Sequence, residues 1–141
     1  MLQQNVQVVL GNANYVCQVN DGTHQWIIDE PVSKGGNDLG TNPFAALLAS
    51  LGSCSAITIK MYAQRKGWDV QKIEISLNLS HTLIADKKVN VFMRDITIDG
   101  NLTEEQISRL KEIVKACPVS KVLEGNIEII TTLTKSDAIK L

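Results

Sequence analysis

The chain has 141 residues, of which 44% are hydrophobic and 21% charged, the ordinary composition of a folded domain. Its 14 basic and 15 acidic side chains nearly balance, so neither a nucleic acid nor an anionic membrane is an expected partner. This length predicts a single domain over residues 1–141 that buries a core without a metal or a disulfide. No secretory signal is visible and no stretch approaches membrane-spanning length, so we expect a cytoplasmic protein.

Three cysteines, Cys17, Cys54 and Cys117, are the residues of greatest chemical interest. An odd count in a reducing compartment argues against a framework of structural disulfides. The cysteines are not clustered in C-x-x-C pairs, and His24 and His81 lie far from them in sequence, so we expect no zinc site.

The first third of the chain is predicted to form a three-stranded meander followed by a loop. The segments are short, rich in β-branched and aromatic residues, and separated by Gly-Asn and Asp-Gly turn signals. The expected strands are residues 5–10, 15–19 and 24–29. Cys17 would pack under this sheet as a small apolar residue. The Gly- and Pro-rich stretch 30–42 is expected to be a loop.

A long helix is predicted from Pro43 to about Lys66, with Asn42 as its N-cap and Gly67 as its end. This helix is apolar over most of its circumference, which indicates that protein encloses it on several sides. One expected apolar stripe consists of Leu47, Leu51, Cys54, Thr58 and Met61.

Two long strands should follow. Residues 70–80 alternate between apolar and polar side chains, and residues 89–98 are the expected partner strand. The apolar alternation of the second strand shifts by one position after Met93, so we expect a β-bulge near Arg94 and Asp95.

The remaining elements complete an α+β domain with mostly antiparallel pairing. Thr103 and Gln106 have the spacing of a capping box, and the helix that they begin should end or kink at Cys117, before Pro118. A short helix over residues 118–123 and a last strand over 126–133 would follow.

Two of the cysteines could be either reactive thiols or structural residues of the core. Cys54 lies in the long helix among the small residues of LGSCSA, where a cysteine could be inert core or an approachable nucleophile. Cys117 either ends the apolar face of its helix or caps the short helix that follows, where free backbone amides favour a thiolate. Local physics alone leaves both alternatives open for each thiol.

Two segments together resemble the OsmC/Ohr family of osmotically induced and organic-hydroperoxide-resistance proteins. They are TNPFAALLASLGSC, entered from a Gly-rich loop, and ACPVSKVLEGNIEI, which comes after the second predicted helix. The resemblance spans nearly the whole chain and identifies it as a divergent OsmC-like member.

The resemblance implies a thiol peroxidase site. The cysteine that matches Cys54 attacks a hydroperoxide and becomes a sulfenic acid, and the cysteine that matches Cys117 resolves it as a disulfide. An external dithiol then reduces the disulfide, and no cofactor is required. The implied fold is an intertwined homodimer with the long helices at its centre.

The chain departs from the family pattern at the groups that activate the thiolate. Peroxidase members use an N-terminal arginine and a glutamate at the start of the central helix, but this chain has no arginine before Arg65 and places Phe44 and Ala45 where the glutamate would be. The usual basic residue after C-P-V is Ser120.

Three cations are candidates to replace the missing charge, although each could equally be a solvated surface residue: Lys34, Arg94 and Lys121. Phe44 could line a substrate pocket or could fill the core or an interface.

Two functions follow from this pattern. The first is a two-cysteine hydroperoxide reductase with Cys54 as the peroxidatic and Cys117 as the resolving cysteine. The second is a member of the same fold that binds a small apolar ligand or senses redox state slowly, without catalysis. An apparent pKa of Cys54 well below that of free cysteine would favour the enzyme.

Overall fold

The computed structural model describes residues 5–136. A three-stranded sheet of β1 (Gln7–Leu10), β2 (Cys17–Asn20) and β3 (Gln25–Ile28) comes first, followed by the short 3-10 helix η1 (Val32–Lys34). The long helix α1 (Pro43–Lys66) leads to the paired strands β4 (Lys72–Ile84) and β5 (Lys87–Asp99), and α2 (Glu104–Val114) and α3 (Pro118–Glu124) complete the order. The α+β class, the meander, the long helix and the two long strands are confirmed.

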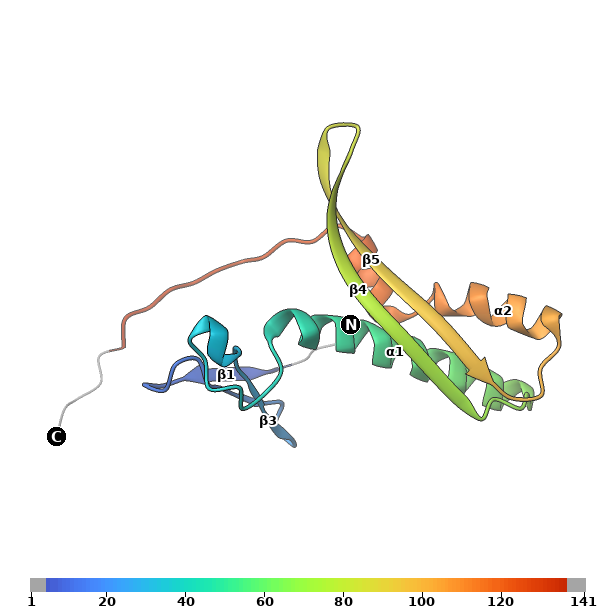
Figure 1. The fold of residues 1–141 in the computed structure, drawn as a ribbon, viewed down its shortest axis with the longest axis horizontal. Helices are drawn as coiled ribbons and strands as arrows, with labels where there is room; N and C mark the ends of the chain where they lie inside the picture. The colour runs from blue at the N-terminus through green and yellow to red at the C-terminus, as the bar shows by residue number, and fades with distance from the viewer. Residues whose placement is uncertain (1–4, 137–141) are drawn as a thin grey trace.

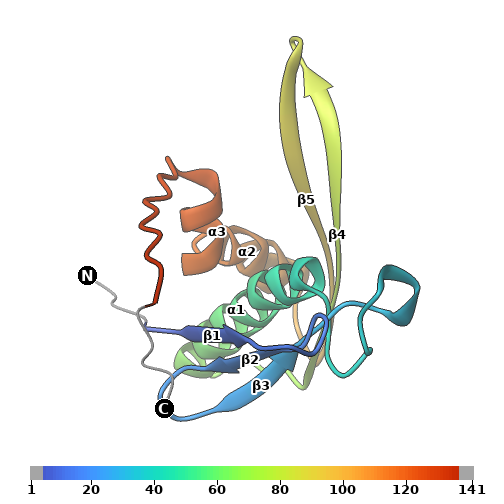
Figure 2. The ribbon, with the colours of Figure 1, turned by 90° about the vertical axis from the view of Figure 1, so that its left-hand side faces the viewer.

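The molecule is elongated, with the three-stranded sheet beyond one end of α1 and a second layer formed by β4 and β5 along it (Figure 1). α2 lies beside α1 on the same side of this hairpin, and Ile96 and Ile98 of β5 pack against the core residues of both helices (Figure 2). The far half of the β4–β5 hairpin projects away from the helices (Figure 2). The sheet of β1–β3 makes few contacts with the other helices and strands, so one chain leaves much of that sheet uncovered.

The pairing of β4 with β5 corrects the predicted bulge. The register runs without interruption from Lys72 opposite Asp99 to Ile84 opposite Lys87, so no extra residue is inserted near Arg94. The shift in the apolar pattern has another cause: Phe92, Arg94 and Ile96 are half-buried on the face toward the helices, whereas Met93 is exposed on the other face. Arg94 therefore points inward from an apolar face.

The caps of both predicted helices are confirmed. The Asn42 side chain accepts a hydrogen bond from the Ala45 backbone N–H at 2.8 Å, and Gly67 ends α1 in the left-handed region at φ 68°. At the start of α2, Thr103 and Gln106 form the reciprocal capping box. α2 ends at Val114 rather than Cys117, because the chain turns before Pro118 begins α3.

The buried stripe of α1 differs from the predicted one. Its buried residues recur mostly at four-residue intervals and are Leu51, Gly52, Ser55, Ile59 and Ala63. Met61, predicted to be in the stripe, is exposed, and Cys54 lies at the edge of the buried face. The core around this stripe joins Ile59 and Ala63 to Leu110 and Val114 of α2 and to Val70 before β4.

An additional buried carboxylate organises the loop that enters α1. Asp29 is 1% exposed and accepts hydrogen bonds from the backbone N–H groups of Tyr15, Glu30, Asn37 and Leu39. Burial opposes ionisation, but the four donors outweigh it and lower the pKa of Asp29. The carboxylate therefore fixes a loop whose Gly- and Pro-rich sequence would otherwise leave it loosely defined.

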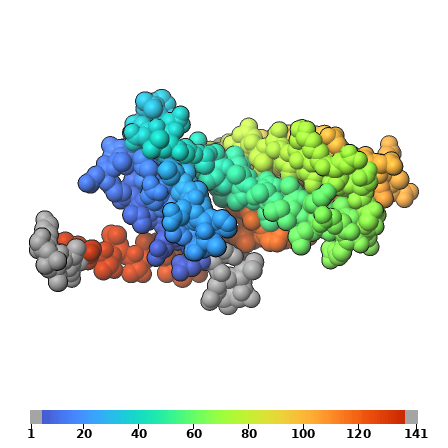
Figure 3. Space-filling model, turned by 90° about the horizontal axis from the view of Figure 1, so that it is seen from below, coloured from blue at the N-terminus to red at the C-terminus, as the bar shows by residue number. Residues whose placement is uncertain are grey.

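The last predicted strand, over residues 126–133, is wrong for the isolated chain. After α3 the chain runs away from the helices as an extended segment without a sheet partner (Figures 1 and 3). Ile129 and Leu133 are 86% and 96% exposed. The alternating sequence has strand character, but a strand needs a neighbour to satisfy its backbone groups, and residues 5–136 of one chain provide none.

By length and composition alone, α1 also satisfies the criteria for a membrane-spanning helix. This corrects the expectation that no stretch of the chain approaches such a length. Within the described chain α1 packs against β4, α2 and α3, and the core helix of a globular fold satisfies the same two criteria.

Candidate redox site

The two thiols singled out by the sequence meet where α1 approaches α3. Cys54 is half-buried on α1, and Cys117, which is 0% exposed, is the N-cap residue of α3. Although 62 positions separate Ser55 from Cys117, the Ser55 Oγ lies 3.8 Å from the Cys117 Sγ. Cys54 is the neighbour of Ser55 on α1, and each of the two thiols shifts the pKa of the other.

The surroundings of the two sulfurs favour a negative charge on Cys117. Burial raises the pKa of the Cys54 thiol, and the neighbouring Cys117 raises it further, against a hydrogen bond from the Val119 backbone N–H. Burial also opposes ionisation of Cys117, but donors from Ser120, Cys54 and Ser55 outweigh it and lower its pKa from 9.0 to about 7. Near neutral pH the pair can therefore hold one negative charge, mainly on the more buried sulfur.

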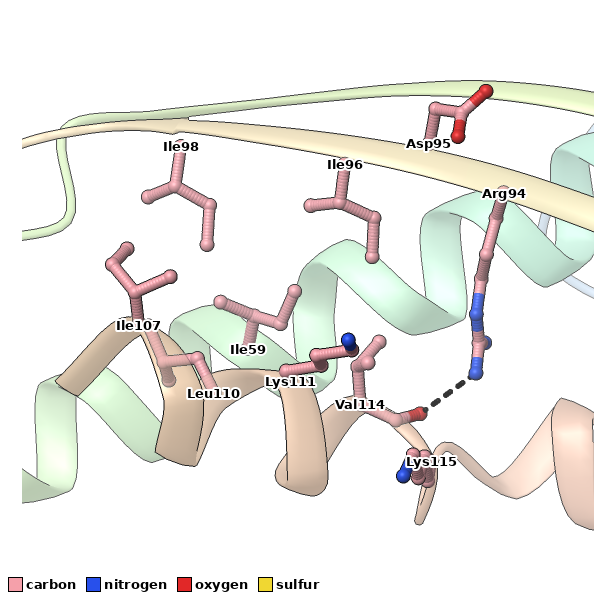
Figure 4. A pocket seen from close by; sticks show the side chains of 10 residues that line it. All are labelled: Ile59, Arg94, Asp95, Ile96, Ile98, Ile107, Leu110, Lys111, Val114 and Lys115. Carbon is pink, nitrogen blue, oxygen red and sulfur yellow. Dashed lines mark hydrogen bonds between the residues drawn. The ribbon is translucent and has the colours of Figure 1, made fainter. Parts of the chain in front are cut away.

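Arg94 is the predicted cation that the fold brings to this pair. Its Nη1 donates to the Ser55 Oγ at 2.8 Å and to the Ser120 Oγ at 2.6 Å. Its Nη2 donates to the Val114 carbonyl oxygen at 3.3 Å, the contact drawn in Figure 4. The guanidinium thus connects β5 with α1, α2 and α3 around Cys117.

The other sequence candidates lie elsewhere. Lys34 is exposed in η1 and Lys121 is exposed on α3, and within residues 5–136 neither makes a hydrogen bond or an ion pair with a thiol. Phe44 is 63% exposed in the first turn of α1. In the described part of one chain, Arg94 is therefore the only one of the three cations joined to the cysteine surroundings.

An apolar cavity of about 360 Å³ lies between β5, α1 and α2, next to this site (Figure 4). Six aliphatic side chains line it: Ile59, Ile96, Ile98, Ile107, Leu110 and Val114. Arg94 and Lys115 lie toward one end of this apolar lining, and Lys111 lies between Leu110 and Val114 (Figure 4). The cavity could hold a small apolar molecule, with cations nearby for a polar group.

A larger hollow of about 720 Å³ lies on the other side of Arg94. It is lined by Leu47 and Leu51 of α1, by residues 88–92 of β5, and by Ser120 of α3. Arg94 therefore lines both this hollow and the apolar cavity.

A metal has no evident site in the described part of the chain. Among residues 5–136, no three or more His, Cys, Asp or Glu side chains are grouped to hold an ion.

Sequence reasoning missed Ser55 and Ser120 as members of this site. Both are buried, at 0% and 4% exposure, and both accept from Arg94. Ser55 has a recognisable signal, since it lies four residues from both Leu51 and Ile59 and is therefore a polar residue in the buried stripe. Ser120 has only its place after C-P-V in the sequence as a signal.

Comparison with known proteins agrees with this architecture. The family model described as OsmC-like protein matches residues 35–132. No match was found among curated protein sequences.

Among solved structures, the chain is similar to an OsmC-like protein from Mycoplasma pneumoniae, with 22% identity, 88% and 89% coverage of the two chains and a TM-score of 0.73. It is also similar to an organic hydroperoxide resistance protein from Elizabethkingia anophelis, with 19% identity, 91% and 92% coverage and a TM-score of 0.65. For the organic hydroperoxide resistance protein OhrB of Bacillus subtilis, the identity is 20%, the coverage 89% and 93%, and the TM-score 0.59. At these identities the likeness shows a shared fold.

Proposed function

Because the chain belongs to the OsmC-like family, we propose that it is a thiol-dependent reductase of organic hydroperoxides that uses Cys54 and Cys117. The observation that carries the proposal is the packing of α1 on α3, which brings Cys54, the neighbour of Ser55, close to Cys117 although the two are distant in sequence. Solved structures with the same fold are named organic hydroperoxide resistance proteins, which supports a hydroperoxide as the substrate class.

The proposed reaction divides the work between the sulfurs. The Cys54 thiolate attacks the terminal peroxide oxygen, so that an S–O bond forms, the O–O bond breaks, and the departing alkoxide takes up a proton to become an alcohol. The Cys117 thiolate then attacks the Cys54 sulfur, forming the disulfide and releasing hydroxide, which is protonated to water. An external dithiol supplies the two electrons that restore both thiols.

Burial explains this division. Cys54 is the less buried sulfur and can meet a substrate, whereas Cys117 is fully buried beside it and needs to reach only its neighbour. The lowered pKa of Cys117 supplies the thiolate that the second step requires. We further propose a cytoplasmic setting, in which a dithiol keeps the pair reduced.

Peroxide stoichiometry tests the proposed activity. One equivalent of cumene hydroperoxide should consume two of the three thiols per chain, as measured with a thiol reagent under denaturing conditions, and addition of dithiothreitol should restore them. Consumption of a single thiol, or of none, would contradict the two-cysteine reaction.

Binding of a small apolar ligand without catalysis is the second candidate function. The cavity with six aliphatic lining residues favours it. The raised pKa of the Cys54 thiol favours it as well, because a pKa below that of free cysteine is the property expected of the enzyme. The stoichiometric assay separates the candidates, because a protein that only binds a ligand in this cavity would leave both thiols reduced.

We also propose that the protein is a homodimer in which a second copy covers the apolar segment 126–133. The exposed segment has the alternation of a strand, and β1 presents exposed Val8 and Val9 on an edge strand. On α1, the exposed Ile57 and Met61 likewise lack cover. A second copy offers its own edge strand β1 and its own segment 126–133 for pairing, so two copies can cover the exposed segments of each other.

The dimer should have twice the chain mass of 15.5 kDa by light scattering after size exclusion. Ile129→Asp should shift it toward the monomer, because burying an unpaired charge is costly. Thr132→Asp in the same segment is a control for added charge, since the alternation places residues 129 and 132 on opposite faces of a strand. A monomeric wild-type protein at working concentrations would overturn the proposed dimer.

A further inference from the structure

The hydrogen bonds of Arg94 restrict where the hydroxyl protons of Ser55 and Ser120 can point. A guanidinium has donors and no acceptor, so the Ser55 and Ser120 oxygens must both accept from it. Each hydroxyl proton must then point elsewhere. The Ser55 proton can reach either the Leu51 carbonyl oxygen at 2.6 Å or the Cys117 Sγ at 3.8 Å, and the Ser120 hydroxyl contributes to the lowered pKa of Cys117.

This arrangement distinguishes the two sulfurs of a Cys54–Cys117 disulfide. The Cys117 sulfur is surrounded by donors already held in place by a buried network, and the Ser120 backbone N–H adds another. The Cys54 sulfur has the Val119 N–H and the Thr58 hydroxyl as donors. Among the contacts of residues 5–136, Arg94 donates to neither residue. When a disulfide is cleaved, the sulfur that can better hold a negative charge leaves more easily.

The exposure of the two sulfurs also favours attack on Cys54 with Cys117 as the leaving sulfur. Cys117 is 0% exposed, whereas Cys54 is half-buried at the edge of the α1 stripe. An external thiolate must approach the attacked sulfur closely along the S–S axis, so the less buried Cys54 is the accessible target.

We propose that Arg94 is a positioning residue that, through Ser55 and Ser120, makes Cys117 the leaving sulfur, so that the external reductant attacks Cys54. This inference rests on the proposed disulfide, and it assigns a direction to the reductive half of the cycle. It also gives a role to the cation that replaces the arginine and glutamate expected from the family pattern.

Reduction of the Cys54–Cys117 disulfide proceeds by two thiol–disulfide exchanges. One thiolate of the dithiol attacks the Cys54 sulfur; a mixed disulfide forms, the Cys54–Cys117 bond breaks, and its electron pair goes to Cys117. The second thiolate of the dithiol closes its own disulfide and releases Cys54 as a thiolate, which takes a proton from water. The dithiol loses two electrons, and the protein disulfide gains them.

The direction of attack can be mapped on protein oxidised with diamide, which makes the disulfide without a peroxide. Brief reaction with glutathione, acid quenching and alkylation should yield glutathione on Cys54 and the alkyl group on Cys117, as read by peptide mass spectrometry. Glutathione found mainly on Cys117 would overturn the proposal. Failure of diamide to join the two cysteines would also overturn it, whereas the peroxide assay judges the proposed activity separately.

The role of Arg94 is tested by a pH profile. In a Cys17→Ser, Cys54→Ser background, the ultraviolet absorbance of the Cys117 thiolate, which needs no access to the buried sulfur, should titrate with a midpoint below the ordinary value of 9.0, because the donors from Ser55 and Ser120 remain. Arg94→Gln should move the midpoint toward the ordinary value of 9.0 and, with both cysteines present, slow reduction of the disulfide roughly threefold to tenfold because the leaving sulfur becomes more basic.

Two further variants separate this role from a general structural one. Ser120→Ala should move the midpoint in the same direction, because it removes the hydroxyl between Arg94 and the sulfur. Arg65→Gln, which removes an exposed arginine at the end of α1, should leave the profile unchanged. An unchanged midpoint in folded Arg94→Gln and Ser120→Ala proteins, verified by circular dichroism, would refute the positioning role.

Discussion

Replacing Cys54 with serine should abolish reduction of organic hydroperoxides, with a fall in turnover of about a thousandfold or more, because the reaction loses its nucleophile. A serine hydroxyl is a far poorer nucleophile toward a peroxide oxygen than a thiolate, and Cys117 is too deeply buried to take the place of Cys54. Hydroperoxide consumption in the presence of dithiothreitol, followed by a ferrous-oxidation colour assay, measures the effect.

The other two cysteines serve as matched controls. Cys17→Ser in β2 should retain full turnover, since Cys17 belongs to the separate three-stranded sheet. Cys117→Ser should still react once with peroxide but should accumulate sulfenic and sulfinic acid on Cys54, because no neighbouring thiol can resolve it. Full activity in Cys54→Ser would show that the nucleophile is another residue.

Leu110→Ala should destabilise the protein by about 2–5 kcal/mol, the usual range for a large-to-small change in a core. Leu110 is 1% exposed and belongs to the core cluster with Ile59 and Ala63 of α1. Because Leu110 also lines the apolar cavity, the change should enlarge an existing space rather than let the surroundings close around it. Urea denaturation at a fixed protein concentration measures the loss.

Ser108→Ala provides a control on the same helix. Ser108 is exposed on α2, so its replacement should change the free energy of unfolding by no more than about 0.5 kcal/mol. A comparable effect for the two substitutions would show that α2 is not packed through Leu110 as described.

Local signals predicted most of the helices and strands well. The capping residues Asn42 and Thr103 and the glycine at position 67 are short-range signals, so both helix starts and the end of α1 could be placed from sequence. The two-residue turn of the long hairpin was less visible, because Ala85 and Asp86 adopt positive φ without the usual Asn-Gly signature.

The errors occurred where a segment depends on a partner. The shifted apolar pattern of β5 was attributed to a bulge, whereas the regular register turns Arg94 inward and leaves Met93 outward on the other face. The segment 126–133 has a strand pattern but no strand beside it in the described chain. Alternation shows which side chains share a face; it does not show whether the same chain covers that face.

The candidate site could be predicted only in part. The sequence selected Cys54, Cys117 and Arg94 as candidates, and the fold brings them together. It could not select Arg94 over Lys34 and Lys121, because that choice depends on the pairing of β5 with β4 and the packing of α3 on α1. Ser55 and Ser120, the links between the cation and Cys117, became apparent only from the three-dimensional arrangement.

Mapping of the disulfide formed by one equivalent of organic hydroperoxide tests the central claim most directly. Peptide mass spectrometry without reduction should find Cys54 joined to Cys117, with Cys17 free. Two free thiols at Cys54 and Cys117 after the peroxide has been consumed, or a disulfide that includes Cys17, would contradict the assignment of this pair as the redox site.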